Sequence, residues 1–340
     1  MTRTPVQRRA LRKECDWVLP DFAEPSPADE FSRLATWCDA NGIEHDRYGE
    51  GELVEGFERK IATLLDKPAA VFMASGVMAQ LAAVRIWTEA AGVSRFGMHP
   101  TSHLALHEEQ AHAALMHCHG VPIGNRLRPI RAGDLEASRQ ALACLIVELP
   151  IREAGGQLPT WDELEALKNA ARQRGVHLHM DGARLWESAA HYGKSHAEIA
   201  AGFDSVYVSV YKGIGGFAGA VLAGNAEFVA EARLWRRRMG GTLHHLTPMV
   251  ASAALRFDER LAMMPALYER ALVLAAGLAT VPGLRVNPAV PHTNMMHLYF
   301  DAPAEAVADA RDSLADPSLG VQNERVIPLF AQLCQAMQST

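Results

Sequence analysis

The sequence predicts an α/β protein with a mainly parallel central sheet, helices on both faces of that sheet and a small C-terminal α+β domain. The first observation is that short apolar segments alternate with longer amphipathic ones through the middle of the chain. This alternation is typical of strand–helix–strand units, whose strands run parallel. The second is that Asp181 and Lys212 each come just after such an apolar segment. In open parallel sheets, groups at these strand ends line the ligand crevice.

The expected elements follow one another regularly from about residue 50. A helix over 75–92 has Ser75 at its N-cap position and Gly92 beyond its end, and a helix over 160–175 begins with a threonine cap. Further helices are expected over 53–65, 103–120 and 245–275, and strands over 69–74, 143–150, 176–180 and 205–210.

The ends of the chain are less regular. Residues 1–45 are mixed, with a proline-rich loop over 19–30, and the segment around 293–300 begins a smaller lobe after the long helix. We therefore expect an N-terminal segment (1–45), a large domain (46–245), and a connecting helix with a small C-terminal domain (246–340).

Composition excludes several classes of protein. The formal net charge of −6 argues against a nucleic-acid surface, and no apolar run in the sequence reaches the length of a membrane span. The basic N-terminus is not followed by the apolar region of a secretory signal. The five cysteines form no C-x-x-C pair, which favours reduced thiols in the cytoplasm.

The segment SVYVSVYKGIGGFAGA (205–220) ends an apolar strand in a single lysine, Lys212, followed by four glycines in seven positions. Lys212 is either a solvated strand tip or a desolvated amine that can attack a carbonyl. The glycines would let the backbone approach a ligand closely. The segment matches neither a Walker A loop nor G-x-G-x-x-G, so it does not indicate a nucleotide site.

A buried carboxylate beside a buried amine is the arrangement that pyridoxal phosphate requires. The lysine forms a Schiff base, and the aspartate keeps the ring nitrogen protonated so that the ring accepts carbanion electrons. The phosphate needs N–H donors, which the helix start at Ser75, Gly76 and Val77 would supply. Each residue also has a purely structural interpretation when it is taken singly: Asp181 as a strand-end turn residue and Ser75 as an ordinary helix cap.

Four segments resemble the low-specificity L-threonine aldolases, which belong to the β-eliminating lyase group of fold-type I pyridoxal phosphate enzymes. These segments are HMDGARLWESAAHYG, SVYKGIGGFAGAVLAG, FMASGVMAQLAAV and PHTNMMHLYF, and the similarity runs from about Tyr48 to Phe300. The resemblance implies that Lys212 forms the Schiff base and that Asp181 pairs with the pyridinium.

The same resemblance implies roles for other residues. Arg184 would bind the cofactor's phenolic oxygen or the substrate carboxylate, and His103 would stack on the ring and act in catalysis. Ser75, Gly76 and Val77 would bind the phosphate. Tyr48 would reach the substrate in the site of a neighbouring subunit, so that a homodimer or homotetramer with shared sites is expected.

The chain departs from the family pattern at several positions. Tyr211 replaces the serine that usually precedes the lysine. The turn that carries a second histidine reads ELPIREAGG here, with Arg152 and Glu153 in its place. His245 occupies the position of a phosphate-binding arginine, and Arg325 is the candidate for the arginine that holds the substrate carboxylate. The basic run of Arg236, Arg237 and Arg238 is either a family feature or a solvated helix face.

Two other functions compete with an aldolase. Six histidines between residues 99 and 119 suggest a metal site, but the two in HEEQAH are five apart and fall on different sides of a helix. A serine hydrolase is disfavoured because no G-x-S-x-G occurs. A non-enzymatic protein that keeps the cofactor fold remains an alternative.

The function expected from the sequence is retro-aldol cleavage of a β-hydroxy-α-amino acid, such as L-threonine or L-allo-threonine, to glycine and an aldehyde. β-Elimination on the same cofactor is the alternative reaction. No metal, nucleic acid or membrane is expected to take part.

Overall fold

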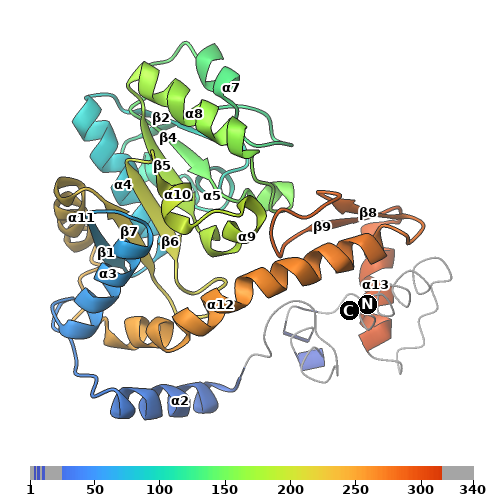
Figure 1. Ribbon diagram of the computed structural model, residues 1–340, viewed down its shortest axis with the longest axis horizontal. Helices are drawn as coiled ribbons and strands as arrows, with labels where there is room; N and C mark the ends of the chain where they lie inside the picture. Colours follow the sequence, from blue (N-terminus) through green and yellow to red (C-terminus); the bar gives the residue numbers. More distant parts are fainter. Residues whose placement is uncertain (1–3, 5, 8–9, 12–24, 316–340) are drawn as a thin grey trace.

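The computed structural model describes residues 4, 6–7, 10–11 and 25–315. Its centre is a seven-stranded sheet of order β1-β7-β6-β5-β4-β2-β3, in which only β7 runs antiparallel to its neighbours (Figure 1). The predicted mainly parallel sheet is therefore confirmed. The strands are β1 (Ala69–Met73), β2 (Arg95–Met98), β3 (His119–Pro122), β4 (Cys144–Glu148), β5 (His177–Gly182), β6 (Ser205–Ser209) and β7 (Ala220–Gly224).

Helices cover both faces of this sheet. Alternate residues of β1 belong to different cores: Phe72 packs in the cluster that α3, α8 and α12 supply, and Met73 in the cluster of α4 and α11. This period of two is expected of a strand with both faces buried. The helices are α2 (Pro27–Ala40), α3 (Glu52–Leu64), α4 (Gly76–Ala91), α5 (His103–Leu106), α6 (Ala111–Ala114), α7 (Ala132–Ala137), α8 (Trp161–Arg174), α9 (Ala189–Tyr192), α10 (His196–Ala200), α11 (Ala226–Arg238), α12 (Thr247–Leu278) and α13 (Ala304–Ala315), with short 3₁₀ turns η1 (Arg152–Ala154) and η2 (Leu185–Glu187).

The two capped helices form as predicted. The Ser75 hydroxyl accepts from the Met78 amide at 3.2 Å, and α4 ends at the left-handed Gly92. In α8, Thr160 and Glu163 make a reciprocal capping box. Side-chain caps satisfy amides that the first turn of a helix leaves unpaired, which is why these signals locate the helix starts well.

The helix expected over 103–120 is wrong. The segment forms two four-residue helices, α5 and α6, and then enters β3. Glu109, Gln110 and His117 have φ between 47° and 55°, which an α-helix does not allow. The apolar spacing of HLALHEEQAHAALM was helical, but the chain turns twice inside it.

Other elements were also missed. Residues 27–30 of the expected proline-rich loop are the first turn of α2, with Ser26 as N-cap and Pro27 in the first turn. Strands β2, β3 and β7 were not expected, and β7 begins directly after the four glycines that follow Lys212. These strands are four or five residues long, which gives little periodicity for a sequence pattern to reveal.

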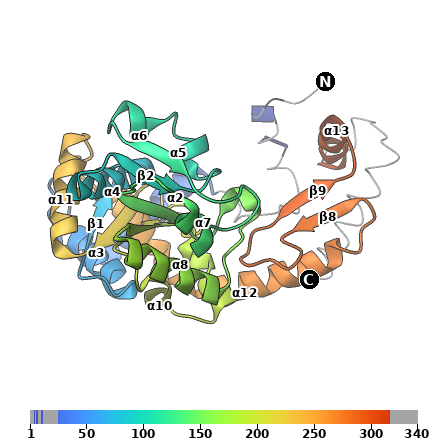
Figure 2. The ribbon, with the colours of Figure 1, turned by 90° about the horizontal axis from the view of Figure 1, so that it is seen from above.

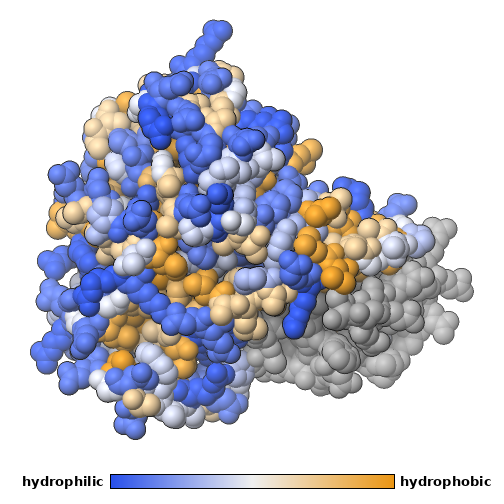
Figure 3. Space-filling view, in the orientation of Figure 1, coloured by the Kyte–Doolittle hydropathy of each residue, from blue (hydrophilic) through white to orange (hydrophobic). Residues whose placement is uncertain are grey.

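The long connecting helix is confirmed as α12, which runs from the large sheet to a small antiparallel pair, β8 (Leu284–Asn287) and β9 (His297–Phe300), beside α13 (Figure 2). By length and composition alone, α12 is long and apolar enough to cross a membrane, whereas no run of the sequence was expected to reach that length. Its first half packs against the large domain through Ala253 and Phe257, as core helices also do. Apolar side chains gather over β8 and β9, where Tyr299 and Val290 are exposed (Figure 3). The domain boundaries proposed above stay a prediction.

Candidate active site

Three buried side chains line one face of the sheet near the carboxyl ends of its central strands. Glu148 on β4 is the register partner of Asp181 on β5, and Asp181 is the partner of Tyr207 on β6. Residues paired in register project from the same face of a sheet, so these three side chains form a row. The parallel pairing of β5 and β6 brings Asp181 and the loop that carries Lys212 to the same edge of the sheet, as expected for the ends of neighbouring parallel strands.

Lys212 lies three residues beyond the end of β6, in the loop that leads to β7. Its amide donates to the Ser209 hydroxyl at 3.3 Å, which anchors the turn. Burial lowers the pKa of the Lys212 amine, and the charge of Arg184 adds to this effect against the opposing charge of Asp181. Lys212 is only partly exposed, and a partly desolvated amine with a lowered pKa is a competent nucleophile, so the desolvated interpretation is better supported than a solvated strand tip.

The glycines after Lys212 pack mainly against the protein. A methyl group on Gly216 would lie 2.7 Å from the Val210 carbonyl oxygen and 3.1 Å from Ala253 of α12. One on Gly213 would lie 2.5 Å from the Glu187 carboxylate. Close approach does explain the glycines, but at these two positions the neighbour is another part of the chain rather than a ligand.

The carboxyl groups around Lys212 compete for protons. Burial raises the pKa of Asp181, while Lys212 and the Ala183 amide at 3.1 Å favour its charged form. Burial and the neighbouring Asp181 raise the pKa of Glu148 to about 8, and burial raises that of Glu187 to about 7. Two adjacent buried carboxylates repel each other, so the charge of one raises the pKa of the other, while Lys212 and the Ala183 amide favour the charged form of Asp181.

Arg184 follows Asp181 by three residues and begins η2. Its charge acts on Lys212, Tyr211 and Glu187, so the guanidinium lies within this group. Tyr211, which replaces the expected serine, is 41% exposed and lies beside the Lys212 amine, with the nitrogen 5.9 Å from the ring centre.

The start of α4 borders the same crevice. A methyl group on Gly76 would overlap the Tyr207 hydroxyl, so glycine is required for the helix to sit against β6. The Ser75 hydroxyl caps the helix, as its ordinary interpretation holds. In the described part of the chain the Gly76 and Val77 amides meet no acceptor, which leaves two N–H groups at a helix N-terminus for an anion.

His103 and His107 each lie beside a carboxylate, and His103 is also an electrostatic neighbour of Asp181. His103 Nδ1 is 2.9 Å from Glu108 Oε1, and His107 Nε2 is 3.0 Å from Glu153 Oε1. The sequence did not indicate Glu108 as the partner of His103. Glu153, from the turn that carries a second histidine in the family, pairs with His107. His103 and Glu108 are five residues apart and span the end of α5, so helical periodicity in the sequence could not have indicated that they meet.

The described residues contain no group of three or more histidine, cysteine or acidic side chains that could hold a metal. Three of the six histidines between residues 99 and 119, His99, His103 and His107, have hydrogen-bond partners of their own. His99, for example, is buried and bonds to Thr101 and to the Asn125 and Arg128 carbonyls, which fixes the loop before His103.

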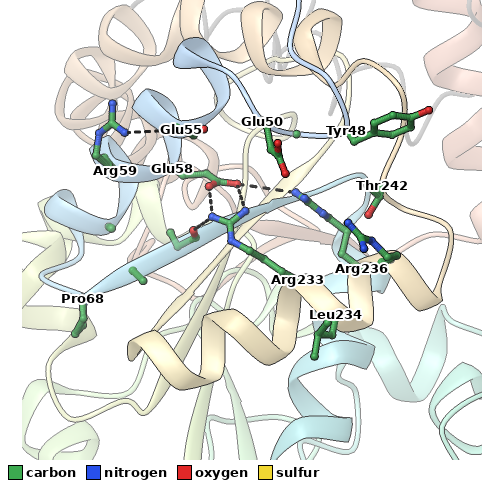
Figure 4. A pocket seen from close by; sticks show the side chains of 15 residues that line it. Tyr48, Glu50, Glu55, Glu58, Arg59, Pro68, Arg233, Leu234, Arg236 and Thr242 are labelled. Atoms are coloured by element: carbon green, nitrogen blue, oxygen red, sulfur yellow. Dashed lines mark hydrogen bonds and ion pairs between the residues drawn. The ribbon is translucent and has the colours of Figure 1, made fainter.

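Tyr48 is not brought to Lys212 within the chain. It lines a separate cavity of 540 Å³ with Arg233, Arg236 and Glu58 (Figure 4). Arg236 is buried, donates to the Phe72 carbonyl at 2.9 Å and lies 4.0 Å from Glu58, so it is not part of a solvated helix face.

The remaining members of the basic region lie nearby. Arg237 lines the cavity, and Arg238 stacks over Trp235 at 4.7 Å. His245 Nδ1 donates to the Asp46 carbonyl at 2.5 Å, and the rings of His244 and Tyr48 meet at 5.2 Å. Arg325 lies outside the described residues.

Comparisons with known proteins agree with this geometry. The family model described as beta-eliminating lyase matches residues 30–302. A solved structure of a proposed L-allo-threonine aldolase from Listeria monocytogenes is 34% identical, with a TM-score of 0.87 over 97% of this chain and 98% of that one. A structure from Exiguobacterium, described as an aromatic amino acid beta-eliminating lyase/threonine aldolase, has the same identity and TM-score over 96% and 99%. Low-specificity L-threonine aldolase 1 of Arabidopsis thaliana is 26% identical over 80% of this chain and 78% of its own.

Proposed function

We propose that this chain, which belongs to the beta-eliminating lyase family and is a pyridoxal phosphate-dependent lyase of the threonine aldolase type, cleaves L-threonine or L-allo-threonine to glycine and acetaldehyde. The observation that carries the proposal is the partly buried Lys212 amine near the buried Asp181, both just past or at the ends of parallel strands. The description of the Listeria structure as a proposed L-allo-threonine aldolase supports aldol cleavage.

The residues present fit pyridoxal phosphate. Lys212 has a lowered pKa, and the Gly76 and Val77 amides are without an acceptor in the described residues. Buried oxygens of Glu148 and Glu187 also lack partners there. Lys212 would hold the aldehyde carbon, Asp181 the ring nitrogen and the two amides the phosphate. When bound, the cofactor supplies an electron sink for the bond broken at the substrate's α-carbon.

The side chains divide the remaining work. Asp181 holds a negative charge where a ring nitrogen must keep its proton, and Arg184 supplies a cation for the substrate carboxylate or the phenolic oxygen. Because a carboxylate only accepts, His103 must donate its Nδ1 proton to Glu108, which leaves Nε2 as a base. His103 Nε2 can then take the proton of the β-hydroxyl as the carbon–carbon bond breaks.

The assembly and location remain proposals. We propose a homodimer or homotetramer, which is supported by Tyr48: it is 55% exposed and lies in a cavity apart from Lys212, where it could serve a neighbouring site. A cytoplasmic location is supported by the free thiols of Cys38, Cys118 and Cys144.

The test is to identify the products. The purified protein loaded with pyridoxal phosphate is incubated with L-threonine and with L-allo-threonine, and glycine, acetaldehyde and 2-oxobutanoate are measured. Glycine with acetaldehyde supports the proposal, 2-oxobutanoate would replace it with β-elimination, and no product from a cofactor-loaded protein would favour a binding protein. Lys194→Ala, at an exposed lysine paired with Glu198, is the control for Lys212→Ala.

A further inference from the structure

A second imidazole lies beside His103 at the crevice. His107 is the C-cap of α5, and its amide donates to the His103 carbonyl at 2.8 Å. The two ring centres are 5.2 Å apart with the planes tilted by 49°, and each side chain is 38% exposed. Side chains four residues apart project from one side of a helical turn, so both rings face the same way.

Each ring is fixed by its own carboxylate, but through the opposite nitrogen. His103 donates from Nδ1 to Glu108, whose side chain is only 2% exposed, and keeps Nε2 free. His107 donates from Nε2 to Glu153 and keeps Nδ1 free. The two imidazoles therefore offer two proton-accepting nitrogens from neighbouring positions.

Glu153 is itself held in place. Arg152 Nη1 donates to the same Oε1 at 2.5 Å. Burial alone would raise the pKa of Glu153, but the bond from His107 and the charge of Arg152 outweigh it and lower the pKa. The carboxylate thus stays ionised and fixes the proton of His107 on Nε2.

The electrostatic neighbours place this pair at the reacting centre. His103 is an electrostatic neighbour of Asp181, Arg152 of Lys212, and His297 on β9 of Glu153. His107 therefore lies near both the groups around Lys212 and the small domain, because its neighbour His103 interacts with Asp181 and its partner Glu153 interacts with His297.

We propose that His107, beside His103, binds the β-hydroxyl of the substrate and determines how the enzyme discriminates between diastereomers, with Glu153 and Arg152 as its positioning residues. This inference rests on the function proposed above. L-Threonine and L-allo-threonine differ only at the β-carbon, so with the amino acid part fixed the hydroxyl and methyl groups exchange places. Two imidazoles with ring centres 5.2 Å apart can each offer a nitrogen to the hydroxyl, His103 in one arrangement and His107 in the other.

The test compares kcat/KM for the two diastereomers in four proteins: the parent, His107→Phe, Glu153→Gln and the control His119→Gln, an exposed histidine on β3. His107→Phe keeps a ring and removes the hydrogen bond. We expect the ratio of the two kcat/KM values to change about tenfold, which corresponds to roughly 1.4 kcal/mol for one hydrogen bond. Glu153→Gln should shift the ratio in the same direction by less, and the control should leave it unchanged.

The competing explanation is that His107 and Glu153 only clasp α5 to the loop after β4. In that case His107→Phe lowers the melting temperature or scales both kcat/KM values equally, and an unchanged ratio overturns the proposal. If the parent cleaves both substrates and the ratio is unchanged, the proposed function stands while this inference fails.

A binding measurement decides the point even for a parent that cleaves neither substrate. Titration calorimetry on the cofactor-loaded protein compares each diastereomer with L-2-aminobutyrate, which lacks the hydroxyl. We expect the parent to bind at least one hydroxylated ligand more tightly, and His107→Phe to reduce that advantage by about tenfold. An equal advantage in both proteins would refute the role of His107.

Discussion

Gly76→Ala tests how the start of α4 is seated on the sheet. The added methyl group would overlap the Tyr207 hydroxyl and lie 3.0 Å from its Cζ atom. Tyr207 is 3% exposed, so its ring cannot swing into solvent. Overpacking of this kind costs about 1–3 kcal/mol, and we expect that loss in the free energy of unfolding.

The consequence for the site follows from the same overlap. If α4 moves to relieve it, the Gly76 and Val77 amides move too, and the affinity for pyridoxal phosphate should fall. Urea unfolding and titration of the cofactor-free protein with pyridoxal phosphate measure the two effects. The control is Gly133→Ala in α7, where an added methyl group meets no atom within 4 Å. It should be neutral or stabilise by about 0.5–1 kcal/mol.

A double variant makes the reasoning refutable. Tyr207→Phe removes the overlapping oxygen and leaves the ring, so Gly76→Ala should cost less in the Tyr207→Phe background. The expected coupling is at least about 1 kcal/mol, beyond what independent sites show. Strictly additive effects, or a Gly76→Ala protein as stable as Gly133→Ala, would show that the start of α4 is not held by this contact.

Three further predictions concern the charged groups of the crevice. Lys212→Ala should abolish turnover and fixed attachment of the cofactor; borohydride reduction of the parent and peptide mapping should place the label on Lys212, and a label on Lys194 would contradict this. Asp181→Asn should retain cofactor but lose about 10²-fold in rate, roughly 3 kcal/mol, whereas near-normal turnover would make Asp181 a mere turn residue. Because burial raises the pKa of Glu187 from 4.5 to about 7, the folded protein binds more protons than the unfolded chain between these values, and stability falls as pH rises through them. Urea unfolding of the cofactor-free protein at several pH values measures how the free energy of unfolding changes with pH. Glu187→Gln should reduce the slope of this dependence by up to about 1.4 kcal/mol per pH unit. Identical slopes in the two proteins would mean that Glu187 is ionised and paired.

The sequence by itself determined the α/β class, the capped helices α4 and α8, the long helix α12, and the positions of Asp181 and Lys212 past apolar segments. These features are encoded locally. A capping side chain lies within three residues of the amide that it satisfies, and an apolar strand or helix face repeats over a few positions. The segments around Lys212 and Asp181 were also distinctive enough to indicate the family.

Only the tertiary structure decided which side chains meet. The left-handed residues Glu109 and Gln110 broke the expected helix after His107, and this turn allowed His103 to pair with Glu108. Strand register placed Glu148 beside Asp181, and the packing of α5 against the loop after β4 joined His107 to Glu153. Such pairs depend on loop dihedrals and on contacts between segments far apart in the chain, and short-range periodicity carries no information about either.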